Sequence, residues 1–259
     1  MTVSSPFYSE DHEAFRSLIQ QFTNKEIVPY IQEWEQAGEV PRDLYKKAAS
    51  IGIFGDGFEE QYGGHGQRDA ILRMVMMQEL AMAGSGGVVA SMLSNYIGLP
   101  PIQRAGSDEM KRRVLTPCLA GDAVAALAIT EPSGGSDVAR IQTVAKRDGE
   151  EFIVNGQKTF ITSGMHANFL TVAVRTGDEG ARGVSLLLIE GDRKGVERTR
   201  LEKMGWLSSD TATLYFDDVR VPITNLIGEE ATGFSAIVNN FNAERIDRAG
   251  QLISYSRAC

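Results

Sequence analysis

Hydrophobic residues recur at helical spacing along the first part of the chain. The period of about 3.6 residues predicts amphipathic helices, with further apolar helical segments at 67–82 and 85–97. We therefore expect residues 1–119 to form an α-helical N-terminal domain. The clearest stripe is at i, i+3, i+4 and i+7, and consists of Phe15, Leu18, Ile19 and Phe22.

The pattern changes near residue 120, where short apolar runs of strand length replace the helical stripe. Asp148-Gly149 and Asn155-Gly156 each lie between two such runs, which is the strongest short-range signal for a β-hairpin. Because strands and helices do not alternate, a Rossmann fold is disfavoured. We expect residues 120–232 to form an antiparallel β-barrel or sandwich.

A helical pattern returns in the last part of the chain, 233–259. Phe234, Ile237, Val238 and Phe241 lie on one face of the expected helix. A single helix of this kind would leave its apolar face uncovered. The whole chain thus predicts an α+β multidomain protein, in which this segment begins a third, helical unit.

Charge and cysteine content exclude several classes of protein. The chain has 26 Lys and Arg against 34 Asp and Glu, a net charge of −8, which argues against nucleic acid as a partner. Its two cysteines, Cys118 and Cys259, form no CxxC motif, and its three histidines have no metal-ligand spacing, so we expect no metal site. Charged and polar residues interrupt the longest apolar run. We therefore expect a cytoplasmic protein without membrane insertion.

Two segments of the expected β region carry residues suited to ligand binding. The loop Thr130–Asp137, with sequence TEPSGGSD, follows a strand, and its paired glycines and hydroxyls could contact a phosphate or carbonyl oxygen. A polar loop without a ligand is the alternative. Phe160 and Thr162 fall on one face of a strand and could stack on and hydrogen-bond a planar cofactor. Ordinary half-buried sheet would show the same alternation.

The final helix carries a third candidate, Glu244 followed by Arg245. A carboxylate beside apolar residues could serve as a general base, and an arginine could hold a phosphate. Neighbouring residues on a helix point in different directions, so an ion pair between these two does not explain them. The alternative is a charged, solvated helix face.

Taken together, these segments resemble the acyl-CoA dehydrogenase family from near Phe7 to the end of the chain. The most specific stretch is Ala128–Asp137, which is similar to the family's signature loop. The order and spacing of several further motifs agree with that family. They are Glu60-Gln-Tyr-Gly-Gly64, Lys203-Met-Gly-Trp206, Ser209-Asp-Thr211, Phe216-Asp-Asp-Val-Arg-Val-Pro222 and Asn225-Leu-Ile-Gly-Glu-Glu230.

This resemblance implies a helical N-terminal domain, a β middle domain and a C-terminal four-helix bundle, of which 233–259 would be the first helix. It also implies FAD as cofactor and oxidation of an acyl-CoA thioester to the trans-2-enoyl form. Electron-transfer flavoprotein is the expected electron acceptor. A tetramer or dimer is the expected assembly of the full-length protein, and fatty acid metabolism the expected context.

The resemblance also assigns roles to cofactor-binding residues. The backbone and hydroxyls near the end of the first strand would contact the flavin ring, while Phe160 takes the place of an aromatic residue that packs against it. Gly135 and Ser136 would contact the cofactor phosphates or the thioester arm of the substrate. The expected flavin contacts are Leu127, Ile129, Thr130, Phe160, Ile161 and Thr162.

For the substrate, the resemblance points to Glu244 as the base that removes the α-proton, as in the isovaleryl-CoA and long-chain branches. Arg245 would contact the CoA portion and Phe241 the substrate. Asn242 stands where many members have Asp and would also contact the substrate. Tyr96 could limit the depth of the acyl pocket, but the acyl chain length cannot be derived from these residues.

Two other interpretations remain open. A protein of the same fold could react with oxygen, as the oxidases and monooxygenases of the family do, although the intact signature loop and Glu244 favour a dehydrogenase. A shortened, non-catalytic relative could instead bind acyl-CoA or a partner protein. Oxygen consumption and flavin absorbance would distinguish these cases.

The length of the last segment leads to a prediction. A four-helix bundle needs on the order of 100 residues, and only 233–259 remain for it. We expect this 259-residue chain to bind FAD weakly and to turn over poorly. A purified preparation that is yellow, stoichiometrically loaded with flavin and active would contradict the prediction.

Overall fold

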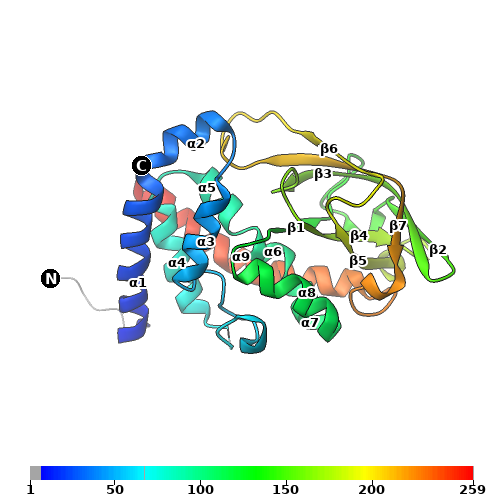
Figure 1. Ribbon diagram of the computed structural model, residues 1–259, viewed down its shortest axis with the longest axis horizontal. Coiled ribbons are helices and arrows are strands. Elements are labelled where there is room, and N and C mark those ends of the chain that lie inside the picture. Colours follow the sequence, from blue (N-terminus) through cyan, green and yellow to red (C-terminus); the bar gives the residue numbers. More distant parts are fainter. Residues whose placement is uncertain (1–6, 67, 259) are drawn as a thin grey trace.

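The computed structural model describes residues 7–66 and 68–258. Helices and a sheet occupy opposite ends of the molecule, and a long last helix, α9 (Gly233–Ala258), runs behind the other helices toward the sheet (Figure 1). This arrangement confirms the predicted α+β fold class. The helices are α1 (Glu10–Phe22), α2 (Ile31–Ala37), α3 (Arg42–Ser50), α4 (Ala70–Ala81), α5 (Gly86–Met92), α6 (Asn95–Gly98), α7 (Pro100–Ala105), α8 (Asp108–Leu119) and α9 (Gly233–Ala258).

The strands form one curled sheet in the order β1-β4-β2-β3-β7-β6, with β5 paired to β4. Most pairings are antiparallel, as expected, but β1 runs parallel to β4. Along the chain, the β2–β3 hairpin lies between β1 and β4. The chain therefore comes back to the edge of β1 as β4, which runs in the same direction as β1. The strands are β1 (Ala125–Ala128), β2 (Val144–Asp148), β3 (Glu151–Thr162), β4 (Phe169–Arg175), β5 (Val184–Glu190), β6 (Val196–Arg200) and β7 (Thr211–Pro222).

Only one of the two expected Asx-Gly hairpin turns forms. Asp148-Gly149 connects β2 to β3, and Gly149 has a φ of 60°. The prediction for Asn155-Gly156 is wrong, because this pair lies within β3 at a shift in its register with β7. The Asn155 side chain there exchanges two hydrogen bonds with Asp218, each of 2.9 Å. Long-range pairing therefore overrides the local turn signal and makes a β-bulge.

Strand β5 separates two hydrophobic cores. Leu186 and Leu188 belong to the core between the helices and the sheet. Leu187 and Ile189 point to the other face and belong to a core enclosed by the curled sheet. This alternation is the two-residue period of a strand that is buried on both faces.

The short helix α6 attaches the helical layer to the free edge of β1. The Asn95 side chain accepts a hydrogen bond from the Ala125 backbone N–H at 2.8 Å, and Ser94 donates to the Ala125 carbonyl, also at 2.8 Å. From β4, the Thr171 hydroxyl donates to the Gly98 carbonyl at 2.8 Å. The backbone groups of an edge strand are thus satisfied by side chains in a dry interface.

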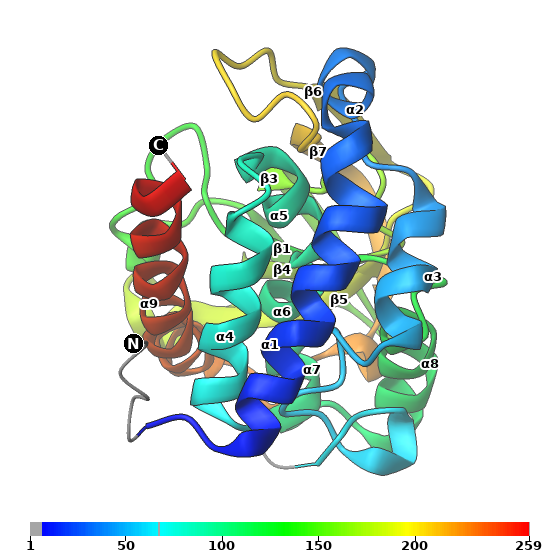
Figure 2. The ribbon, with the colours of Figure 1, turned by 90° about the vertical axis from the view of Figure 1, so that its left-hand side faces the viewer.

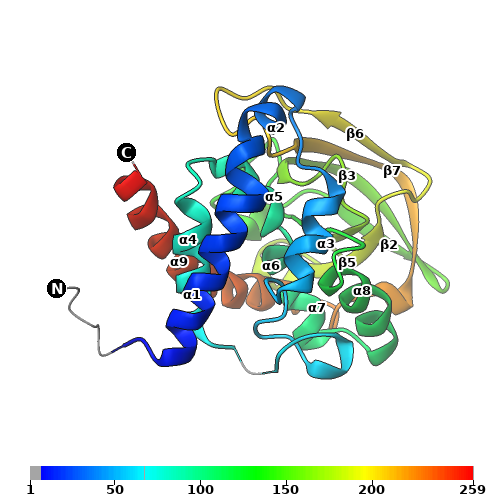
Figure 3. The same cartoon turned by 60° about the vertical axis from the view of Figure 1, so that its left-hand side comes forward.

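Helix α9 lies along α4, and its first turn rests on β5 (Figures 1 and 2). The side it buries is unusually polar and includes Asn240, Asp247, Gln251 and Ser254. Of the face that was expected to lie uncovered, Ile237 is buried and Phe234 and Phe241 pack against the core, because the start of this helix lies against the sheet and the other helices. Several other apolar side chains of the same helix are exposed, together with Val238. These are Ile246, Leu252 and Ile253. Figure 3 shows that α9 projects past the other helices toward the C-terminus.

The close contact of α6 with β1 gives a prediction for stability. A Cβ atom at Gly98 would lie 2.9 Å from the Ala125 carbonyl carbon and 3.0 Å from the Ala126 nitrogen. Because both are backbone atoms, Gly98→Ala should lower the free energy of unfolding by about 1–3 kcal/mol. Urea denaturation measures this change.

Gly205→Ala is the control, since a Cβ atom there would meet nothing within 4 Å. Its free energy of unfolding should stay within ~0.5 kcal/mol of the wild type. Equal stability of the Gly98 variant and the control would contradict the tight α6–β1 contact.

Candidate functional site

The loop Thr130–Asp137 emerges from β1 as a tight, solvent-facing turn. Glu131 and Gly134 exchange two backbone hydrogen bonds, of 3.0 and 3.1 Å. Beyond Glu131 the loop is exposed, and this exposed part includes Gly135 and Ser136. Nothing lies within 4 Å of the position that a Gly134 Cβ would take. The loop backbone is therefore open to a ligand.

Phe160 presents its ring to solvent from an irregular position in β3. It has a φ of 58°, and 70% of its surface is exposed. It lies where the register between β3 and β7 shifts, between Lys158 and Ile161. A positive φ is strained for an aromatic residue, and an exposed ring of this size is a surface that a planar ligand could cover.

The residues expected to contact the flavin differ in how exposed they are. Ile129 and Ile161 are buried, whereas Leu127, Thr130 and Thr162 are partly exposed. Buried side chains leave only the backbone of these two isoleucines for contact with a cofactor. The assignments themselves stay predictions.

Lys158 and Thr159, which were not among the candidates, connect β3 to the end of β1 and the loop Thr130–Asp137. The Lys158 ammonium donates to Glu131 Oε1 at 2.7 Å and to the Ile129 carbonyl at 3.1 Å. One residue further, the Thr159 N–H donates to the Thr130 carbonyl at 2.8 Å. The presence of a lysine among the strand residues at 158 was the only sequence signal for this contact.

The second part of the candidate site lies on the helical side, around Glu244. A cavity of about 230 Å³ contains Glu244 together with Tyr96, so the structure brings together the expected base and the expected end of the acyl pocket. The cavity is also lined by Asp56, Gly57, Phe58, Arg68, Arg73, Pro100, Gln103, Arg104, Asn240 and Asp247.

Tyr96 forms a fixed wall of this cavity. Its hydroxyl donates to the Ile53 carbonyl at 2.5 Å, and the Arg73 guanidinium lies over its ring, 4.0 Å from the centroid. Arg73 is itself buried between two carboxylates, 2.9 Å from Asp56 and 3.5 Å from Asp247. Charge pairing of this kind is what makes burial of an arginine tolerable.

The carboxyl group of Glu244 has an unusual proton affinity. Burial raises its pKa to about 7, and the nearby Asp247 carboxylate acts in the same direction. The Asn240 side chain donates to Glu244 Oε1 at 2.7 Å. A carboxyl group whose pKa lies near neutrality can accept and release a proton under ordinary conditions.

The remaining substrate candidates lie on the outer side of α9. Phe241 and Arg245 border a shallow hollow that also reaches Glu244. Arg245 is exposed and donates to the Asn242 side chain at 3.0 Å. Glu244 therefore lies between an inner cavity and an outer hollow.

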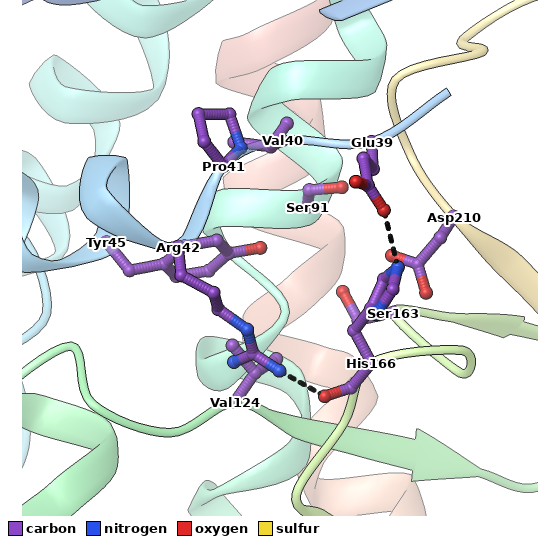
Figure 4. A pocket seen from close by; sticks show the side chains of 10 residues that line it. All are labelled: Glu39, Val40, Pro41, Arg42, Tyr45, Ser91, Val124, Ser163, His166 and Asp210. Carbon is purple, nitrogen blue, oxygen red and sulfur yellow. Dashed lines mark hydrogen bonds and ion pairs between the residues drawn. The ribbon is translucent and has the colours of Figure 1, made fainter. Parts of the chain in front are cut away.

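A further small cavity, of about 130 Å³, is lined by residues of the helical layer and by Ser163 and His166, which follow β3 (Figure 4). His166 pairs with Glu39 there at 2.9 Å, and Arg42 donates to the His166 carbonyl. These contacts connect the α2–α3 loop to the residues that follow β3. Ser163, directly after Thr162, is buried and lines this cavity.

Comparison with known proteins identifies the class to which this fold and site belong. Residues 9–122 match the acyl-CoA dehydrogenase N-terminal domain and residues 126–219 the acyl-CoA dehydrogenase middle domain. The chain belongs to the acyl-CoA dehydrogenase family. This confirms the resemblance that the motifs indicated.

Individual relatives agree with this assignment. The chain is 38% identical over 251 residues to the long-chain specific mitochondrial acyl-CoA dehydrogenase of Rattus norvegicus, and the match covers 95% of this chain and 58% of that protein. The solved structure of a putative acyl-CoA dehydrogenase from Mycobacterium smegmatis is 44% identical, with a TM-score of 0.95 over 98% of this chain and 67% of that one.

A solved relative also carries a flavin. It is a glutaryl-CoA dehydrogenase from Mycobacterium smegmatis in complex with FADH2, with 27% identity, a TM-score of 0.89 and coverage of 97% of this chain and 64% of that one. The chain spans about 58% of the length of curated relatives such as the rat protein.

In residues 7–66 and 68–258, no helix is both long and apolar enough to cross a membrane. No group of three or more potential metal-ligating side chains occurs in the same part of the chain.

The pKa of Glu244 predicts a pH dependence of stability. Glu244 loses its proton near pH 4.5 in an unfolded chain and near pH 7 in the folded one. The folded state binds the proton more tightly than the unfolded state. The contribution of Glu244 to the free energy of unfolding should therefore fall as the pH rises from about 4.5 to about 7. Urea midpoints at pH 5 and pH 7.5 measure it.

In Glu244→Gln that part of the pH dependence should disappear. The exposed Glu229→Gln variant is the control and should keep the wild-type slope. An unchanged slope in the Glu244 variant would show that its carboxyl group titrates as an ordinary glutamate.

Proposed function

We propose that this chain carries the cofactor-contacting residues and the catalytic base of an FAD-dependent acyl-CoA dehydrogenase. The observation that supports this most directly is the position of Glu244. It is a half-buried carboxyl group with a pKa of about 7, in a cavity shared with Tyr96 and directly before Arg245. Family membership and this carboxyl group point to the same reaction, the α,β-dehydrogenation of an acyl-CoA thioester.

The residues of the β region fit a flavin. The ring of Phe160 and the backbone of the Gly134-Gly135 loop are both exposed. They lie on two segments that the hydrogen bond from the Thr159 N–H to the Thr130 carbonyl joins, and they offer an aromatic surface and N–H donors. In this proposal Leu127, Ile129, Thr130, Ile161 and Thr162 contact the isoalloxazine ring. When bound, FAD supplies the acceptor for the hydride that leaves the substrate β-carbon.

The residues of α9 would manage the proton. The Glu244 carboxylate takes the proton from the α-carbon of the thioester, and its elevated pKa makes it a stronger base than an exposed glutamate. The amide of Asn240, 2.7 Å from Oε1, holds that oxygen in place and leaves Oε2 for the substrate.

The remaining residues would orient the substrate. Arg245, exposed at the outer hollow, would contact the phosphates of CoA, with Phe241 and Asn242 beside it. Ser136 on the open loop would contact the thioester arm. Tyr96, held by its bond to Ile53 and by Arg73, would close the inner end of the acyl site.

For partners, the family relationship supports electron-transfer flavoprotein as the acceptor of the reducing equivalents and a homo-oligomer as the assembly. Both are carried over from the family resemblance. The acyl group remains to be determined by a panel of straight, branched and aromatic acyl-CoA thioesters.

Removal of the base tests the proposal. Glu244→Gln keeps the size of the side chain and one acceptor oxygen but cannot take a proton. With FAD at saturation, the rate of acyl-CoA-dependent flavin reduction should fall by about 10²–10⁴-fold. The dissociation constant for FAD should be unchanged.

Flavin absorbance measures both quantities, and Glu229→Gln is the matched control on the surface. Full activity of the Glu244 variant would place the base elsewhere. A wild-type chain that binds no FAD would overturn the cofactor assignment itself.

A further inference from the structure

A buried ion pair lies between the two segments that are proposed to face the flavin. Lys158 is fully buried, and only 4% of the Glu131 side chain is exposed. Their closest atoms, Lys158 Nζ and Glu131 Oε1, are 2.7 Å apart. The pair joins the loop after β1 to the middle of β3.

Every polar contact of the Glu131 carboxylate connects the loop to its surroundings. Oε1 also accepts from the Thr143 N–H at 2.9 Å, and Oε2 accepts from the Gln142 N–H at 2.6 Å. Burial alone would raise the pKa of Glu131, but the Lys158 ammonium and these donors hold it below its usual value. The carboxylate is therefore ionised and attached to two parts of the chain, Lys158 in β3 and the segment Gln142-Thr143 before β2.

Lys158 acts on the other side of the pair. Its ammonium donates to the Ile129 carbonyl as well as to Glu131, so it holds the end of β1 directly. Burial lowers its pKa to about 8, and pairing with Glu131 keeps it charged at neutral pH. Lys158 also lies at the register shift that turns the Phe160 ring outward.

The energetic cost of burying two charges indicates that this pair fixes the position of the chain segments that it joins. Removing two charges from water is costly, and well-packed apolar residues in place of a buried ion pair are frequently as stable or more so. A charged pair with all its donors and acceptors aligned instead has one preferred distance and direction. Here the pair acts on the same two segments as the backbone hydrogen bond from the Thr159 N–H to the Thr130 carbonyl, which is 2.8 Å long.

We infer that Lys158 and Glu131 are positioning residues, a clamp that holds the Ile129–Thr130 backbone and the Phe160 ring at the separation needed to receive the isoalloxazine ring of FAD. This inference rests on the proposed function. It assigns no contact between either side chain and the cofactor. The clamp acts through the two segments that it joins.

A double-mutant cycle tests the clamp on the chain as it stands. Lys158→Met and Glu131→Gln each remove one partner, and the double variant removes both. FAD binding is measured by flavin fluorescence, and urea unfolding without FAD gives the folded fraction by which each dissociation constant is corrected. Each single variant should bind FAD at least ~10-fold more weakly, because a small misplacement of contacting groups is costly.

The double variant should bind FAD no more weakly than whichever single variant has the lower affinity, because the clamp is already broken once one partner is absent. Glu79→Gln is the matched control. Glu79 is a buried carboxylate that pairs with Arg16 of α1 at 2.6 Å, within the helical layer. The Glu79→Gln variant should be less stable than the wild type, while its dissociation constant for FAD stays within about twofold of the wild-type value.

If Lys158→Met fails to fold, the clamp is tested with Glu131→Gln and the charge-preserving Lys158→Arg. Lys158→Arg should then retain more affinity for FAD than Glu131→Gln. Variants that lose stability but bind FAD as tightly as the wild type would overturn the clamp and leave the proposed function intact. Equal loss of affinity in Glu79→Gln would also overturn it. A wild-type chain without FAD binding would overturn both.

Discussion

The free edge of β1 is the constraint on which both halves of the candidate site depend. An edge strand that faces a dry helical layer must have its N–H and C=O groups paired, since an unpaired buried polar group costs about as much as a lost hydrogen bond. Asn95 and Ser94 supply those partners to Ala125 at 2.8 Å each. Along the chain, Tyr96 directly follows Asn95, and β1 leads directly to Leu127–Thr130. One docking contact therefore positions the proposed end of the acyl site and the start of the proposed flavin site.

The two halves of the site use charge for different purposes. On the helical side, Arg73 is paired with Asp56 and Asp247 and stacks on Tyr96, while Glu244 has no such cation within hydrogen-bonding distance among the described residues. Burial then raises the pKa of Glu244 to about 7. In the β region, Glu131 is fully paired, and its pKa is lowered. The same side-chain type is suited to proton transfer in one place and to holding backbone segments in the other. Burial outweighs the more distant Arg248 and Arg245 at Glu244, whereas the directly paired Lys158 outweighs burial at Glu131.

The sequence was most informative where local rules decide. Helical and strand periodicity predicted the α+β class, and the order of motifs from the Glu60 loop to the Asn225 segment indicated the family, which the comparisons confirm. Local signals failed at Asn155-Gly156, where pairing with β7 changed an expected turn into a bulge. They also gave no indication that β1 runs parallel to β4, since strand direction depends on how the chain crosses the sheet.

By itself, the sequence determined the types of chemistry that this chain can offer: a carboxylate before an arginine on a helix, an aromatic residue in a strand and a glycine-rich loop. Only the tertiary structure decided which of these groups lie near one another and in what environment. It placed Glu244 in a cavity with Tyr96 and paired Lys158 with Glu131 across 27 residues of chain. The physical reason is that pKa values, burial and ion pairing depend on neighbours brought together by packing, and residue spacing along the chain does not contain that information.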